Sequence, residues 1–192
     1  MKYVYFLFLL LPNLILSQVS TNNIENDFIE FRKLYDTNKN EKALNYFSDY
    51  YFETTSREEM LKYYEEHPRI NTPTIEYKTQ IDSIEKPVNV DGIYYSLIAY
   101  SRILEQNSVH SNDSISNENI DNKIKILKKI FGENNIIYDK KTEKIYFKKN
   151  YYAFAILKIN QLHWKFIFVE EDNYSLINKV IPKKIIPEEI QN

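Results

Sequence analysis

The spacing of apolar residues along this chain changes close to Pro73 from a helical period to a strand period. Before Pro73, large apolar side chains recur every three or four residues, which is typical of amphipathic helices. After Pro73, apolar and polar residues alternate, which is typical of strands with one buried face. We therefore expect an α+β fold in which N-terminal helices pack across the concave face of a curved antiparallel sheet.

Local signals set the boundaries of the expected elements. Ser56 and Glu59 have the spacing of a capping box, which begins a helix, and Pro68 disfavours its continuation. Asp91 and Gly92 favour a tight hairpin turn because both residues tolerate positive φ angles. Helices are expected over residues 24–35, 41–52, 57–66, 120–131 and 174–181, and strands over residues 75–82, 93–104, 136–138, 144–148, 151–159 and 164–170.

The first 17 residues are typical of a secretory signal peptide. Lys2 precedes an apolar stretch over residues 6–16, and the small Ser17 stands at a plausible cleavage point. An apolar run of about eleven residues is too short to span a bilayer as a helix. The alternative is a short uncleaved N-terminal anchor. Residues 18–192 are expected to form one α+β domain with a flexible loop over residues 106–119 and a frayed tail over residues 183–192.

The composition excludes several kinds of chemistry. The chain has no cysteine, which excludes disulfides and thiolate metal sites, and its two glycines are too few for a phosphate-cradling loop. Charges of both signs are mixed along the chain and the net charge is −2, so no nucleic-acid partner is expected. No cofactor is expected. The signal peptide and the lack of cysteine together favour an exported bacterial protein, in the periplasm or outside the cell.

Candidate catalytic residues are few. The histidines are His67, His110 and His163, and none has the spacing of a metal site, so no metal is expected. His163 is the best candidate for a general base, with Asp82 or Glu76 as the carboxylate that orients it. The alternative is a solvated histidine in a turn.

The aromatic residues indicate a binding site more strongly, since the chain has 17 tyrosines, 11 phenylalanines and 1 tryptophan. Alternation with Lys165 along the last strand predicts that Trp164 lies in the core. Arg102 and inward-facing tyrosine hydroxyls are expected to orient a small, largely apolar ligand, whereas ordinary core packing is the alternative. The pocket candidates are Phe31, Tyr35, Tyr77, Tyr95, Arg102, Trp164 and Phe166.

Three C-terminal segments resemble a family of small exported proteins from flavobacteria and their relatives. The segments are YDKKT at residues 138–142, HWKF at 163–166 and LINKVIPK at 176–183. That family resembles the nuclear-transport-factor-2-like (cystatin-like) superfamily, and the resemblance implies a cone in which helices close over a bent sheet. The superfamily includes ketosteroid isomerases and scytalone dehydratases, whose catalytic motifs have no match here, so the resemblance implies no activity.

These observations favour a non-enzymatic exported module that binds a small apolar ligand or a protein. One alternative is a small-molecule lyase or isomerase with a cone-shaped pocket. Another is an inhibitor or immunity-type protein of the cell envelope, which binds its partner through the exposed outer face of the sheet. The same outer face is the expected surface for a homodimer, and no stable membrane span is expected after signal cleavage.

Overall fold

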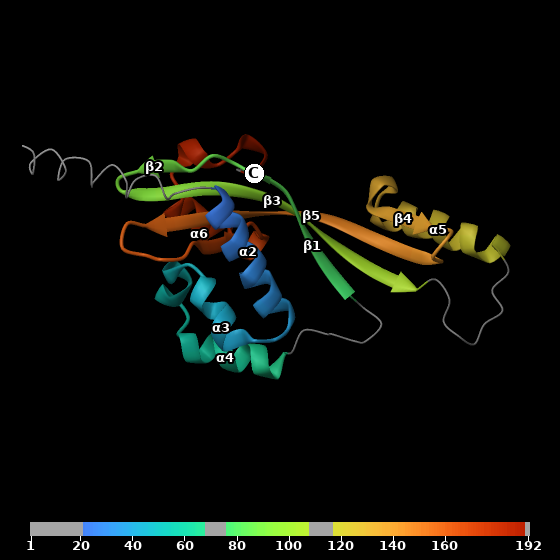
Figure 1. Ribbon diagram of the computed structural model, residues 1–192, viewed down its shortest axis with the longest axis horizontal. Coiled ribbons are helices and arrows are strands. Elements are labelled where there is room, and N and C mark those ends of the chain that lie inside the picture. The colour runs from blue at the N-terminus through green and yellow to red at the C-terminus, as the bar shows by residue number, and fades with distance from the viewer. Residues whose placement is uncertain (1–20, 68–75, 108–116, 191–192) are drawn as a thin grey trace, which may run out of the picture.

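The computed structural model describes residues 21–67, 76–107 and 117–190, and its N-terminal part is helical (Figure 1). The helices there are α2 (Thr21–Asp36), α3 (Asn40–Ala43) and α4 (Arg57–Glu66), with short 3-10 turns η2 (Leu44–Tyr46) and η3 (Asp49–Glu53) between α3 and α4. The predicted capping box at Ser56 and Glu59 is confirmed. The helix predicted over residues 41–52 is wrong, because the backbone of Phe47 is extended and pairs with Phe166, which interrupts the helix.

Within the described residues, six strands form one curled antiparallel sheet, which confirms the α+β class. The strands are β1 (Glu76–Ile84), β2 (Val88–Val90), β3 (Ile93–Asn107), β4 (Ile136–Asp139), β5 (Lys144–Lys158) and β6 (Lys165–Phe168). The order is β1-β3-β5-β4, while β2 pairs with β3 and β6 pairs with β5. The turn predicted at Asp91 and Gly92 is confirmed by φ angles of 53° and 80°.

The long hairpin of β3 and β5 is the spine of the sheet. The two strands pair from Ile93 opposite Lys158 to Asn107 opposite Lys144. The two separate strands predicted over residues 144–148 and 151–159 are therefore one strand, because β3 supplies a partner along its whole length. Every second residue of β3 and β5 lies on the same face of the sheet.

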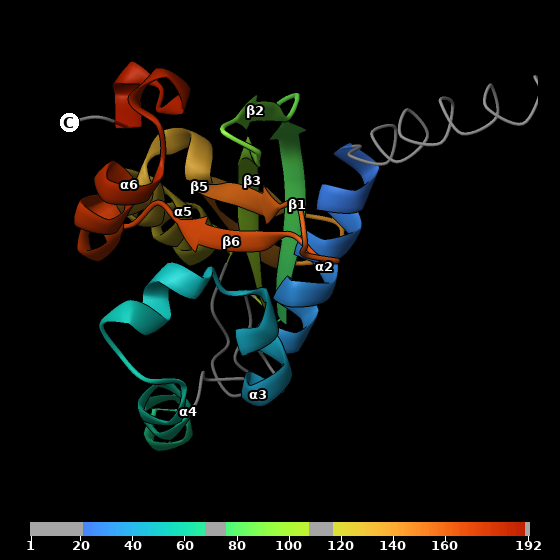
Figure 2. The ribbon, with the colours of Figure 1, turned by 90° about the vertical axis from the view of Figure 1, so that its left-hand side faces the viewer.

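Both faces of the sheet are covered where β6 lies, a region that we call the body (Figure 2). One face packs on α2 through Phe28 and Phe31, on α3 through Ala43, and on α4 through Tyr64. The other packs on α6 (Tyr174–Val180) and on the turns η6 (Lys183–Ile185) and η7 (Glu188–Ile190). The expectation that helices cover a single face is therefore incomplete.

This second layer changes two predictions. The tail expected to fray over residues 183–192 buries Ile186 and Ile190 in its described part, because these side chains cover Leu97 and Phe154 on the sheet. The outer face that was expected to be free for dimerisation is thus covered over the body. The predicted burial of Trp164 is confirmed, with 2% of its surface exposed.

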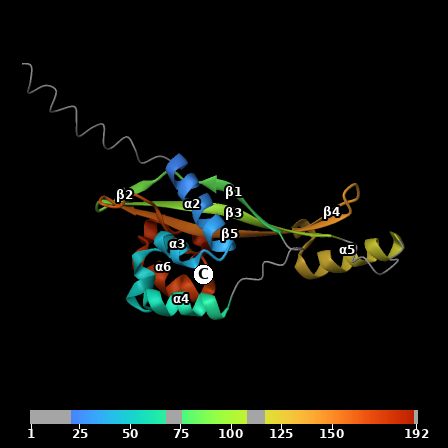
Figure 3. The same cartoon turned by 60° about the horizontal axis from the view of Figure 1, so that its bottom comes forward.

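Beyond the body, the sheet continues into a projection that we call the arm (Figures 1 and 3). The arm comprises residues 103–107 and 117–148, which include helix α5 (Asn117–Phe131), the turn η4 (Glu133–Asn135) and β4. Phe131 of α5 contacts Phe147, which shares its sheet face with Tyr151 of the helix-covered side. Helix α5 therefore lies on the same side of the sheet as α2.

Two sequence predictions fall partly outside the described residues. The predicted loop over residues 106–119 is shorter at both ends, since β3 includes Asn107 and α5 begins at Asn117, and residues 108–116 lie outside the description. The predicted signal peptide also lies outside it. No helix within the described ranges is long and apolar enough to cross a membrane.

Candidate functional site

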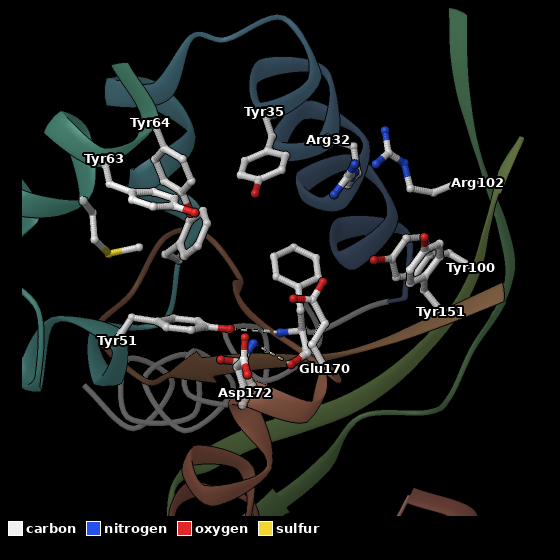
Figure 4. Close-up of a pocket in the computed structure, with 14 residues that line it drawn as sticks. Arg32, Tyr35, Tyr51, Tyr63, Tyr64, Tyr100, Arg102, Tyr151, Glu170 and Asp172 are labelled. Carbon is white, nitrogen blue, oxygen red and sulfur yellow. Dashed lines mark hydrogen bonds between the residues drawn. The ribbon is translucent and has the colours of Figure 1, made fainter. Parts of the chain in front are cut away.

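A cleft with a volume of about 470 Å³ opens between α2, α4, the spine of the sheet and the segment after β6 (Figure 4). A volume of this size is usual for small-molecule sites. We call it the tyrosine cleft because six tyrosines line it, from elements far apart in the chain: Tyr35, Tyr51, Tyr63, Tyr64, Tyr100 and Tyr151.

An arginine pair forms one wall of the tyrosine cleft. Arg32 of α2 and Arg102 of β3 both donate to the same Oδ1 of Asp36, at 2.7 Å and 3.0 Å. The Arg32 side chain is only 6% exposed, whereas that of Arg102 is 22% exposed. Two guanidinium groups and one carboxylate leave the cluster with one positive charge.

The guanidinium of Arg32 is a charged group in a buried position. Burial lowers the pKa of Arg32 and the neighbouring Arg102 adds to the effect, whereas Asp36 opposes it. The guanidinium lies over the ring of Tyr35, 5.1 Å from the ring centroid. Its buried Nε has no hydrogen-bond partner among the described residues. Buried donors are rarely left unbonded in folded proteins, so this wall is suited to an acceptor or an anion.

Two phenols on the cleft wall stay protonated. Burial raises the pKa of Tyr51 and of Tyr100, although Arg32 and Arg102 pull the pKa of Tyr100 back. The Tyr51 hydroxyl accepts the backbone N–H of Phe168 at 3.2 Å, so its own proton is left for donation (Figure 4). The rings of Tyr100 and Tyr151 are stacked, with centroids 5.5 Å apart. The wall thus combines hydroxyl donors with flat aromatic surfaces.

The opposite rim is acidic. Glu170 and Asp172 follow β6 and are exposed, and Figure 4 shows them across the cleft from Arg32 and Arg102. Asn173 ties this rim to the strand, because its amide donates to the Phe168 carbonyl at 3.1 Å. The cleft is therefore positive at one end and negative at the other, which orients any charged ligand.

The structure divides the predicted pocket residues. Tyr35 and Arg102 line the tyrosine cleft. Phe31, Trp164 and Phe166 do not, because they pack in the core beneath the helices. The ring of Phe31, for example, lies 5.7 Å from that of Phe166.

Two further candidates lie away from the cleft. Tyr95 is buried on the opposite face of the sheet, because it is an odd number of residues from Arg102 along β3. Tyr77 lies in β1 opposite Leu104, and its side chain is outside the described part of the structure.

The prediction that Asp82 orients His163 as a general base is wrong. His163 Nδ1 lies 2.9 Å from Asp27 Oδ1 of α2, not near Asp82. Asp82 instead accepts from Ser101 and lies 3.7 Å from the Lys148 ammonium. The Glu76 side chain lies outside the described part. Neither His67 nor His163, the two histidines that the structure describes, lines the tyrosine cleft. No group of three His, Cys, Asp or Glu side chains in the described ranges is placed to hold a metal ion.

Sequence reasoning missed Arg32, Asp36, Tyr51, Tyr100 and Tyr151. Two signals were present. Arg32 and Asp36 have the i, i+4 spacing of a helical ion pair, and Tyr100 is two residues from Arg102, on the same face of a strand. Neither signal shows that the two segments meet, which only the packing of α2 on β3 decides.

No model of a known protein family matches the chain, and no curated protein or solved structure matches it either. Fold and site together define an α+β protein with a half-buried, tyrosine-lined cleft that has an arginine wall and an acidic rim.

Proposed function

We propose that this chain is a non-enzymatic binding module whose tyrosine cleft takes a small organic anion. The observation that carries the proposal is the Arg32–Asp36–Arg102 cluster, in which two arginines share one carboxylate oxygen at the wall of the cleft. Charge-assisted hydrogen bonds from arginine are among the strongest that proteins make to carboxylates. The surplus positive charge of the cluster is available to such a ligand.

The rest of the lining favours a ligand with a flat or ring-shaped body. Tyr35 and Tyr151 offer ring surface, and the protonated hydroxyls of Tyr51 and Tyr100 offer donors at the wall. The sequence predicted a largely apolar ligand, but the lining is polar and therefore favours a more polar one. An aromatic carboxylate combines the two required features.

Binding is favoured over lyase or isomerase chemistry by the positions of the cleft carboxylates and of His163, the histidine predicted as a general base. General acid–base catalysis needs a side chain within hydrogen-bond reach of the reacting proton. Glu170 and Asp172 are exposed at the rim, and His163 is bound to Asp27 outside the cleft. The proposal includes export, from the sequence of residues 1–17, and a nuclear-transport-factor-2-like cone, which the helices over one sheet face support.

The test compares carboxylates with their neutral amides. Benzoate and phenylacetate are expected to bind in isothermal titration calorimetry, and benzamide and phenylacetamide are not. Arg102→Gln reduces the charge of the cluster to zero, and we expect carboxylate affinity to fall about tenfold or more, the usual worth of one charge-assisted bond.

The matched control is Lys62→Gln, which removes the same charge from an exposed i, i+4 pair outside the cleft lining. It should leave binding unchanged. Equal affinity for acids and amides, or equal effects of the two substitutions, would show that the cluster does not bind the anion.

A further inference from the structure

A second cavity of about 330 Å³ lies beside the tyrosine cleft, under the arm. We call it the arm cavity. Arg102 and Tyr151 line both cavities, so the two meet at these side chains. Its apolar wall consists of Leu104 of β3, Phe147 of β5 and Phe131 of α5.

The register of β3 and β5 explains why the tyrosine cleft has a polar lining and the arm cavity an apolar one. On the face that both cavities share, Tyr100 lies opposite Tyr151, the next row pairs Arg102 with Lys149, and the row after that pairs Leu104 with Phe147. Rows on one face are separated by two residues, or about 7 Å along the strand. The face therefore presents hydroxyls, then cations, then apolar side chains, in that order.

The apolar part of this surface is incompletely covered. Phe131 contacts Phe147 edge-on at 5.6 Å, yet 51% of its surface is exposed. Lys149 lies at the boundary, with its ammonium 5.1 Å from the centroid of the Tyr151 ring. An apolar cavity that opens beside two cations complements a molecule with an apolar body and a negative end.

The geometry points to an elongated amphipathic anion, such as a medium-chain fatty acid, as the class of ligand. Its acidic group lies at Arg102 and Lys149, and its hydrocarbon chain extends along Leu104 and Phe147 into the arm cavity. This inference rests on the proposed function, because Arg102 holds the anionic group in both.

The test is a chain-length series. Butanoate, hexanoate, octanoate and decanoate are titrated by calorimetry below their micelle concentrations. Each methylene buried in the arm cavity should tighten binding about fourfold, until the cavity is full. Phe131→Ser opens the apolar wall, and we expect it to weaken decanoate binding about tenfold while butanoate and benzoate keep their affinity.

The matched control is Ile130→Ser, since Ile130 is the adjacent residue of α5, is 65% exposed and does not line the cavity. It should leave the whole series unchanged. If affinity does not depend on chain length while short acids still require Arg102, the inference is wrong and the proposed function stands. If no acid binds, the proposed function itself is wrong. If both α5 substitutions change the sedimentation of the protein and not its chain-length series, the apolar face joins copies of the chain, which also overturns the inference.

Discussion

At the scale of single residues, the tyrosine cleft depends on Asp36. Its Oδ1 holds Arg32 and Arg102 together, although their guanidinium groups repel each other. Arg32 is buried and its desolvation is costly, so this shared carboxylate is what makes the arrangement stable. The same carboxylate positions Arg102 at the junction of the two cavities.

The buried phenols give a pH dependence to stability. Burial raises the pKa of Tyr51 and Tyr100 above the ordinary value of 10.0. The unfolded chain therefore loses these protons at lower pH than the folded chain. Their contribution to stability is complete below about pH 10 and is lost as the pH rises further. We expect the free energy of unfolding, from urea titrations at a series of alkaline pH values, to fall above that pH.

The variant Tyr51→Phe tests this expectation through the slope of the free energy of unfolding against pH. It removes one of the two phenols, so its free energy of unfolding should fall less steeply with pH than that of the wild type. Tyr152→Phe, which removes a hydroxyl from a more exposed ring, measures the background effect of losing one tyrosine. Equal slopes for wild type and Tyr51→Phe would rule out a raised Tyr51 pKa.

At the scale of elements, α2 connects the core, the tyrosine cleft and the last strand. Phe28 and Phe31 point into the core, while Arg32 lines the cleft and is held by Asp36 one turn further along the helix. Near its N-terminal end, Asp27 accepts the backbone N–H of Trp164 at 2.9 Å, just before β6. Helix α2 thus positions the arginine wall of the cleft relative to β6. The acidic rim follows β6 directly in the chain.

We expect Asp27→Ala to destabilise the protein by about 1–3 kcal/mol, because it leaves the N–H of buried Trp164 without its acceptor. Urea unfolding followed by the emission of Trp164, the one tryptophan of the chain, measures the effect. The control is His163→Ala, which removes the exposed partner of the same carboxylate and keeps the Trp164 bond. His163→Ala should lower the free energy of unfolding clearly less than Asp27→Ala does. Equal losses would show that the Trp164 bond is not what Asp27 contributes.

Sequence patterns predicted the elements well where neighbours in the chain decide them. The capping box at Ser56 and the turn at Asp91 were predictable because each depends on residues within one turn of the backbone. The interruption at Phe47 was not, since its extended backbone is held by pairing with Phe166, far along the chain. For the same reason, the continuity of β5 was decided by β3.

At the scale of the whole molecule, the body and the arm differ in the number of packed layers. The body has helices or turns on both faces of the sheet. The arm has α5 on one face, and it buries Ile120, Ile136 and Ile145 while Ile126 and Ile130 remain exposed. The arm cavity lies where this thinner layer meets the body.

We expect the amides of α5 to exchange with solvent at least about tenfold faster than those of α2, because fewer buried apolar contacts oppose local opening of the arm. Hydrogen–deuterium exchange read by mass spectrometry measures both helices in one sample. Helix α2 is a suitable control, since it has 16 residues and α5 has 15. Matching protection in the two helices would mean that the arm opens only when the whole protein unfolds.

The sequence alone determined the helix start at Ser56, the alternation along β3 and the burial of Trp164, because these features follow from signals that are local to each segment. Only the tertiary structure decided the site. Asp36 and Arg102 lie 66 residues apart and meet because α2 packs on β3. Whether an inward-facing aromatic ring lines a cleft, as Tyr35 does, or fills the core, as Phe31 does, depends on where the packed helices leave space, and a residue's own neighbours in the chain do not specify that space.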